Sequence, residues 1–144
     1  LYRGFKPVLW STVEKTALAD AEVEYKDHKS DTIYTSFSVK SSDLKELVGS
    51  EIIIWTTTPW TMPGNRAVAY GKDIDYSLIE VTNIGENSLA KIGDKIIVAK
   101  ELVEDVIREI SVLSFNSSNT LKGSDFAGTV LAHPLNNNGY EHEV

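Results

Sequence analysis

Three consecutive threonines, Thr56 to Thr58, stand in the stretch WTTTPWTMPGN, residues Trp55 to Asn65, directly after an apolar run. A hydroxyl group both donates and accepts hydrogen bonds, so such a row could hold the polar atoms of a ligand or a reacting water. Thr58 before Pro59 suits the first turn of a helix, and Met62 to Asn65 matches a type II turn. We interpret the stretch as a buried strand that opens on a hydroxyl-lined mouth with a rigid rim.

The same stretch also has a purely structural interpretation. Threonine is a good strand residue, and Pro-Gly is ordinary turn chemistry. If a helical turn begins at Pro59, the backbone N–H groups of Trp60 and Thr61 would be free to meet an anion or an electron-rich ligand atom. The pattern alone favours the structural interpretation over the functional one.

Composition restricts the setting of this chemistry. The chain has 144 residues, 42% of them hydrophobic and 24% charged, as in one ordinary globular domain. It has no cysteine, which excludes disulfides and thiolate zinc sites, and no apolar run near the ~20 residues that a membrane helix needs. We therefore expect no membrane contact and a cytoplasmic location. The net charge of −7 is unlike the basic footprint of proteins that bind phosphate backbones, so most affinity for a nucleic acid must come from elsewhere.

Apolar periodicity predicts the elements that position the threonines. Residues 21–26 and 32–39 suggest a hairpin, residues 42–48 a short helical turn, and residues 100–110 the best helix. Further strands are expected at 52–57, 66–70, 76–82, 95–99 and 111–115, bent strands or bulges at 121–135, and a turn at 136–139. Because helices and strands do not alternate, we expect one mainly β domain over residues 1–144, barrel-like with antiparallel or mixed strands and a few short helices.

Other titratable residues offer weaker candidates. His28, His133 and His142 lack metal-ligand spacing, and we interpret each as surface or strand-end structure. Glu22 and Glu24 alternate along one strand and suggest a solvated face rather than an acid–base pair. The sequence contains no phosphate-binding loop of the form GxxxxGK[ST], so ATP use is not expected here.

The stretch Trp55 to Asn65, followed by Arg66-Ala-Val-Ala, resembles the threonine-rich peptide of the editing domain of isoleucyl-tRNA synthetases. Lys6 to Trp10 with Thr16 to Tyr25 is similar to the beginning of that domain, and Gly128 to Leu135 resembles a later strand. The resemblance spans Lys6 to Val144. It implies the fold of the synthetase editing domain and hydrolysis of the ester that joins valine to mischarged tRNA(Ile).

The resemblance also implies roles for single residues. Thr56, Thr57 and Thr58 would be the catalytic residues, and Trp60 and Asn65 would bind substrate. Together they would hold the terminal adenosine, the ester and the attacking water. No metal and no cofactor are implied in this domain, because ATP serves the parent enzyme. The implied partners are the 3′ end of mischarged tRNA(Ile) and the remaining domains of the synthetase, and we expect a monomer.

One departure from the family pattern bears on activity. The chain begins at Leu1 and its single methionine is Met62, so we expect a piece of a longer protein. In the family, a strand like the one at Val144 leads into Gly-Thr-Gly and His-x-Ala-Pro-x-His-Gly, and then an Asp that binds the substrate's α-amino group. A His there helps to exclude isoleucine. This sequence contains neither segment, so we expect an incomplete site. The alternatives are a non-catalytic fragment that binds aminoacyl-adenosine or serves as scaffold, and an unrelated β-barrel interaction module.

Overall fold

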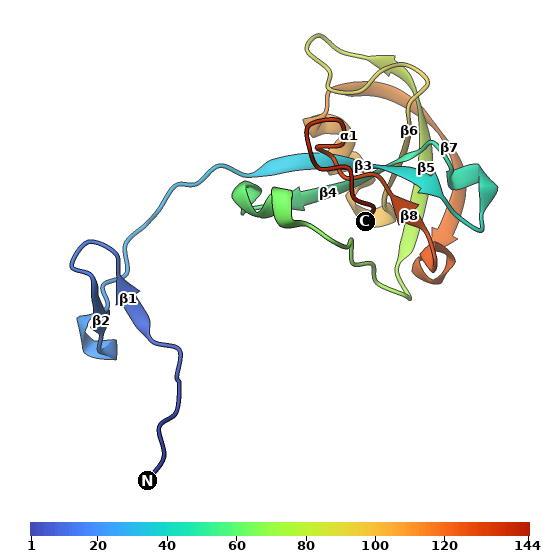
Figure 1. The fold of residues 1–144 in the computed structure, drawn as a ribbon. Coiled ribbons are helices and arrows are strands. Elements are labelled where there is room, and N and C mark those ends of the chain that lie inside the picture. The colour runs from blue at the N-terminus through green and yellow to red at the C-terminus, as the bar shows by residue number, and fades with distance from the viewer. The chain divides into compact units, whose positions relative to one another are not determined.

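The computed structural model describes all residues from Leu1 to Val144, which divide into two compact units, Leu1–Ser30 and Asp31–Val144 (Figure 1). In the first unit β1 (Leu9–Ser11) and β2 (Thr16–Leu18) form a small antiparallel hairpin, followed by the 3-10 helix η1 (Asp20–Glu22). The strand predicted at residues 21–26 is therefore wrong. Its alternating pattern finds no partner strand, since the expected partner pairs elsewhere.

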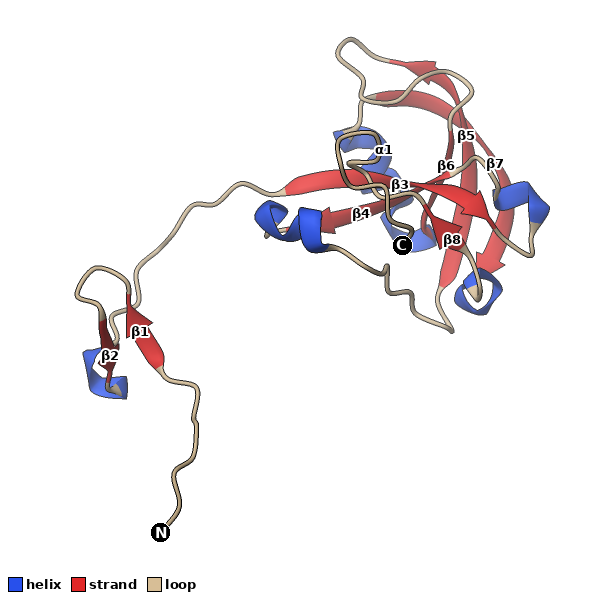
Figure 2. Cartoon of the chain, viewed as in Figure 1, coloured by secondary structure: helices blue, strands red, loops and turns tan.

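The second unit is built on one six-stranded sheet in the order β7-β5-β6-β4-β3-β8 (Figure 2). The β4–β6 pair is parallel, and the other neighbours are antiparallel. The strands are β3 (Ile33–Ser41), β4 (Glu51–Thr56), β5 (Asp75–Ile84), β6 (Lys95–Ala99), β7 (Val112–Lys122) and β8 (Val130–Leu131). The predicted mainly β class with mixed strands is confirmed. The sheet has free edges at β7 and β8, so it is not a closed barrel.

Short helices connect the strands. They are η2 (Lys45–Leu47), η3 (Pro59–Gly64), η4 (Lys100–Leu102), α1 (Val103–Glu109) and η5 (Gly123–Phe126). The helix predicted at residues 100–110 is confirmed, although its first turn is a 3-10 turn. The strand predicted at residues 66–70 is wrong, because this segment pairs with no strand. No helix has the length and apolar character needed to cross a membrane.

The sheet separates two hydrophobic clusters because alternate residues of each strand face opposite sides. Ile97 of β6 joins one cluster, whereas its neighbours Ile96 and Val98 join the other. The first cluster comprises Phe37, Val39, Leu47, Met62, Leu78, Ile97, Leu121, Phe126 and Leu131. The second comprises Ile79, Val81, Ala90, Ile96, Val98, Val103, Val106, Ile110 and Val112, with α1 packed over it. The prediction that residues 1–144 form a single editing domain stays a prediction.

Candidate active site

The strand β4 carries the threonine-rich stretch out of the sheet. Ile52 and Ile54 pack against the first hydrophobic cluster and Ile53 against the second, as the alternation predicts. The ladder between β3 and β4 ends at the pair Ile33–Thr56. The hydroxyl row therefore begins where the strand loses its partner, and a rigid, doubly packed strand holds its first member.

Three hydroxyl groups come together at this strand end. Thr56 Oγ1 accepts a hydrogen bond from the Thr58 N–H at 3.1 Å and lies 3.3 Å from Thr58 Oγ1. Thr58 Oγ1 lies 3.4 Å from Thr61 Oγ1, which donates to the Thr58 carbonyl at 2.8 Å. Thr58 and Thr61 are exposed and Thr56 is half-buried. The contacts between hydroxyls are long for O–H···O hydrogen bonds, so the groups can exchange them for bonds to a ligand or water.

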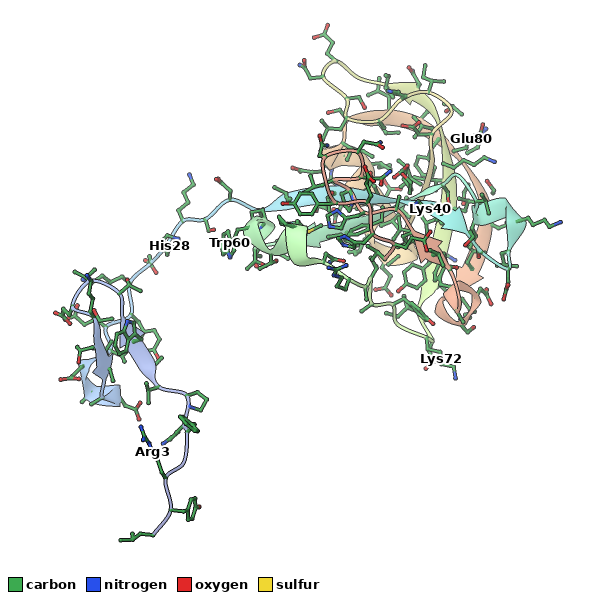
Figure 3. All side chains as sticks on the ribbon, in the orientation of Figure 1. Arg3, His28, Lys40, Trp60, Lys72 and Glu80 are labelled. Carbon is green, nitrogen blue, oxygen red and sulfur yellow. The ribbon has the colours of Figure 1, made fainter.

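The remaining predicted residues lie around this hydroxyl cluster. Thr57 is exposed, and no side-chain hydrogen bond is assigned to it, so its hydroxyl can serve a ligand. The indoles of Trp55 and Trp60 are 56% and 68% exposed, and Trp60 projects from η3 (Figure 3). Exposed indoles are suited to stack on a nucleobase. The structure thus brings Thr56 and Thr58 into contact and places Thr57 and Trp60 at the surface beside them.

The helix η3 fixes the rim of the site. Pro59 occupies its first turn, as predicted, and Met62 is buried in the first hydrophobic cluster. Two details of the prediction are wrong. The Thr61 N–H donates to the Thr58 carbonyl at 3.1 Å and is not free. Gly64 does not take a positive φ, so the segment is a continuous 3-10 helix rather than a type II turn.

Asn65 follows η3 and has an unusual side chain. Its backbone N–H donates to the Met62 carbonyl at 3.0 Å, and its own carbonyl accepts a hydrogen bond from His142 Nε2 at 2.9 Å. The side-chain oxygen Oδ1 is buried and has no hydrogen-bond partner. A buried oxygen without a partner costs about 1–3 kcal/mol. The Asn65 side-chain oxygen therefore has an unused capacity to accept a hydrogen bond.

Two histidines near the site were missed by the sequence interpretation. His133 is 1% exposed and its Nε2 lies 2.8 Å from the Met62 carbonyl. Of the two predicted settings, surface or strand end, it takes the strand end, two residues after β8. His142 contacts Asn65 as described above. Two sequence signals could have identified the pair. His133 lies in the apolar run Val-Leu-Ala-His-Pro-Leu, and the turn predicted at residues 136–139 returns His142 toward it.

Cavities elsewhere in the fold do not coincide with this site. A cavity of about 280 Å³ lies on the second face of the sheet and is lined by Tyr34, Glu51, Asp94 and neighbouring apolar residues. A smaller apolar cavity of about 110 Å³ lies beside Ile52, Tyr76 and Phe126. None of the five predicted site residues lines either cavity. The candidate site is an open strand end, not an enclosed pocket.

Known proteins resemble this chain over its whole length. Residues 1–129 match the family model of class I tRNA synthetases (I, L, M and V). An isoleucine–tRNA ligase of Pelagibacter ubique is 54% identical over 144 residues, which cover 100% of this chain and 16% of that protein. The ligase of Caulobacter vibrioides is 53% identical over 140 residues, covering 94% of this chain and 14% of that protein.

The ligase of Ruegeria pomeroyi is 55% identical over 109 residues, 75% of this chain and 11% of its own length. The chain therefore spans a small part of the curated relatives that it matches. The family match covers the threonine-rich stretch and the strand β4 that presents it. This chain belongs to the class I tRNA synthetase family, and its sequence corresponds to a segment of the isoleucine–tRNA ligases.

Proposed function

We propose that this segment is the post-transfer editing domain of an isoleucyl-tRNA synthetase and hydrolyses the ester of valine mischarged to tRNA(Ile). The observation that carries the proposal is the cluster of threonine hydroxyls at the open end of β4. It is supported by the resemblance of Trp55 to Asn65 to the editing peptide. It is also supported by family membership.

The need for such a reaction follows from the chemistry of the amino acids. Valine lacks one methylene of isoleucine, and this enzyme is itself the usual example that a methylene contributes only about 1–3 kcal/mol of discrimination. A second site that admits valine and excludes isoleucine by size removes the wrong product. Because an aminoacyl ester is already an activated acyl group, a positioned water can attack it without a protein nucleophile or a cofactor.

The proposed roles of the residues follow from their hydrogen-bonding capacity. Thr56 and Thr58, already in contact, would orient the water and the ester, and the unengaged Thr57 hydroxyl would bind a further ester or ribose oxygen. Asn65 Oδ1 would accept a hydrogen bond from the terminal adenosine, and Trp60 would stack on its base. Hydrolysis releases valine and leaves a free hydroxyl on the tRNA, so the only co-reactant is water.

In the family, the Asp that binds the α-ammonium group of the substrate lies in a segment that residues 1–144 do not include. Three acidic side chains of this chain already have partners: Glu22 accepts from the Ala19 N–H and Asp125 from the Lys122 N–H. Glu24 pairs with Lys26. This favours a second candidate function, in which residues 1–144 bind the aminoacylated 3′ end and the family's downstream Asp completes the hydrolytic site.

The partners and location remain proposals. The net charge of −7 favours recognition of only the 3′ end of the tRNA by this segment, and other domains of the parent enzyme would bind the remaining phosphates. ATP would serve amino-acid activation in those domains. The predictions of a monomer and of a cytoplasmic location stay predictions.

The experiment compares a full-length synthetase that contains this segment with its Thr57→Ala variant. We expect slower release of labelled valine from Val-tRNA(Ile), with unchanged charging by isoleucine, because the ligase chemistry uses other domains. Thr120→Ala on β7 is the matched control, since Thr120 is also exposed. Valine release that is equal in all three proteins would exclude a role for Thr57. The isolated chain and the full-length enzyme, compared in the same assay, separate hydrolysis from binding alone.

A further inference from the structure

Two imidazole rings contact backbone carbonyls at the C-terminal end of η3. His133 Nε2 lies 2.8 Å from the Met62 carbonyl and His142 Nε2 lies 2.9 Å from the Asn65 carbonyl. The last carbonyls of a helix are open to donors from outside the helix, and the Met62 carbonyl also accepts from the Asn65 N–H at 3.0 Å. The two histidines supply these donors from a segment about 70 residues further along the chain.

The hydrogen bonds of His133 define its protonation state. The Leu135 N–H donates to His133 Nδ1 at 3.1 Å, so Nδ1 must present a lone pair. The Met62 carbonyl can only accept, so Nε2 must carry the hydrogen. Both bonds exist together only in the neutral Nε2–H tautomer. His142 likewise faces a carbonyl with Nε2, which must be protonated to donate.

The rings pack against one another and against aromatic residues. The His133 and His142 rings lie 4.6 Å apart with an interplanar angle of 49°, and Tyr140 stacks on His133 at 5.6 Å and 25°. Phe37 meets His133 edge-on at 6.4 Å. The position of each ring is therefore set by packing as well as by its hydrogen bond, and neither ring can turn without disturbing the other.

The chain between His133 and His142 reverses direction in a tight turn. Asn137 and Gly139 adopt left-handed backbone angles, φ 69° and 88°, which Asn and Gly tolerate best. The Asn136 N–H donates to the His133 carbonyl at 2.8 Å. After the turn, Val144 pairs with Leu131 through two backbone hydrogen bonds of 2.8 and 3.0 Å. The returning segment therefore brings His142 back to His133 and to Asn65.

We propose that His133 and His142 are positioning residues of the candidate active site. As Nε2–H donors they fix the backbone of η3 and Asn65 and so position the buried Asn65 side-chain oxygen. They act through Asn65 and Met62 and do not touch the substrate themselves. The identity of the ligand rests on the proposed function. The two histidine–carbonyl hydrogen bonds, which we call the backbone clamp, rest on the geometry alone.

Substitution of His142 separates positioning from simple packing. His133 is almost fully buried, so its replacement can prevent folding, whereas His142 is half-buried. His142→Gln keeps an N–H donor at a similar reach, and His142→Phe keeps a ring but has no donor. His28→Ala is the control, because His28 is exposed and belongs to the other compact unit.

The first measurement is amide hydrogen exchange at Asn65 and Thr61, followed by NMR. We expect His142→Phe to accelerate exchange at Asn65 about two- to tenfold, the factor that one net hydrogen bond contributes. His142→Gln and His28→Ala should match the unsubstituted protein. The Nε2–H proton of His133 should appear as a protected imidazole resonance. Unchanged exchange in His142→Phe, or equal acceleration in His142→Gln, would overturn the clamp.

The second measurement is calorimetric binding of a non-hydrolysable valyl-adenosine analogue to the same proteins. We expect His142→Phe to weaken binding by a similar factor and His142→Gln to restore it. Equal affinity in all variants, together with accelerated exchange, would mean that the clamp does not position the site, and the positioning role would be rejected. Failure of the unsubstituted protein to bind the analogue would overturn the proposed function, while the exchange measurement would still decide the clamp.

Discussion

The substitution Asn65→Ala should weaken ligand binding without lowering stability. The side-chain oxygen of Asn65 is buried without a hydrogen-bond partner. Its removal therefore eliminates a desolvation penalty that no hydrogen bond offsets. The two backbone hydrogen bonds of Asn65, to the Met62 carbonyl and from His142, survive the change. The backbone angles, φ −64° and ψ 133°, are open to alanine.

The expected magnitudes follow from these contacts. Relief of a buried, unpaired oxygen is worth about 1–3 kcal/mol, and the lost packing of a half-buried amide offsets part of it. We therefore expect the free energy of unfolding to stay the same or rise by up to about 1 kcal/mol. If the oxygen accepts one hydrogen bond from the ligand, its loss costs about 0.5–1.5 kcal/mol, which weakens binding about two- to tenfold.

Urea unfolding monitored by tryptophan fluorescence measures the first quantity, and calorimetric titration with a non-hydrolysable valyl-adenosine analogue measures the second. Asn116→Ala is the matched control, because Asn116 is exposed on β7 and distant from η3 in the sheet order. Destabilisation by more than about 1 kcal/mol would show that the Asn65 amide is structural. Unchanged binding beside unchanged stability would remove Asn65 from the site.

Three further changes test the scaffold. Met62→Ala should lower the free energy of unfolding by about 2–5 kcal/mol in urea titrations, because Met62 is 8% exposed within the first hydrophobic cluster. Gly64→Ala should leave thermal stability unchanged or raise it by about 0.4–1 kcal/mol, because no atom lies within 4 Å of the added Cβ. A type II turn would make that change costly. Asp75→Asn should destabilise at neutral pH only: the hydrogen bond from Lys122 lowers the pKa of Asp75 below 3.8. The contribution of that ion pair is therefore lost as the pH falls through the lowered pKa, and thermal melts at neutral pH and well below pH 3.8 should show the difference vanish.

The elements that carry apolar periodicity were predictable from the sequence. The strands β4 and β6 and the helix α1 show it clearly, and each buries the faces that the pattern indicated. The polar half of β7, residues 116–120, shows no such pattern. It is a strand because its backbone pairs with β5 across several register shifts. A solvent-facing edge strand needs no buried side chains, so its pattern resembles that of a loop.

Two predicted strands failed for the opposite reason. Residues 21–26 alternate as a strand does and residues 66–70 are mostly apolar, but a strand also needs a partner, and the local pattern does not identify one. In the second segment Val68 still packs against the first hydrophobic cluster, which explains its apolar spacing without a ladder. The hydroxyl row could be predicted because its members are adjacent in sequence. The contacts of His133 and His142 could not, because each joins residues more than 70 positions apart.

The candidate site combines a fixed backbone with loosely held side chains. This combination would let the hydroxyl cluster at the end of β4 bind a polar ligand in one orientation. Burial of Met62, two histidine donors and the β3–β4 ladder fix the main chain from Thr56 to Asn65. The hydroxyls of Thr56, Thr58 and Thr61 contact one another only at 3.3–3.4 Å. When a ligand replaces such long contacts, little hydrogen-bond energy is lost. In addition, an already ordered backbone loses little entropy on binding. Positioning of a water by preorganised groups requires both conditions at once.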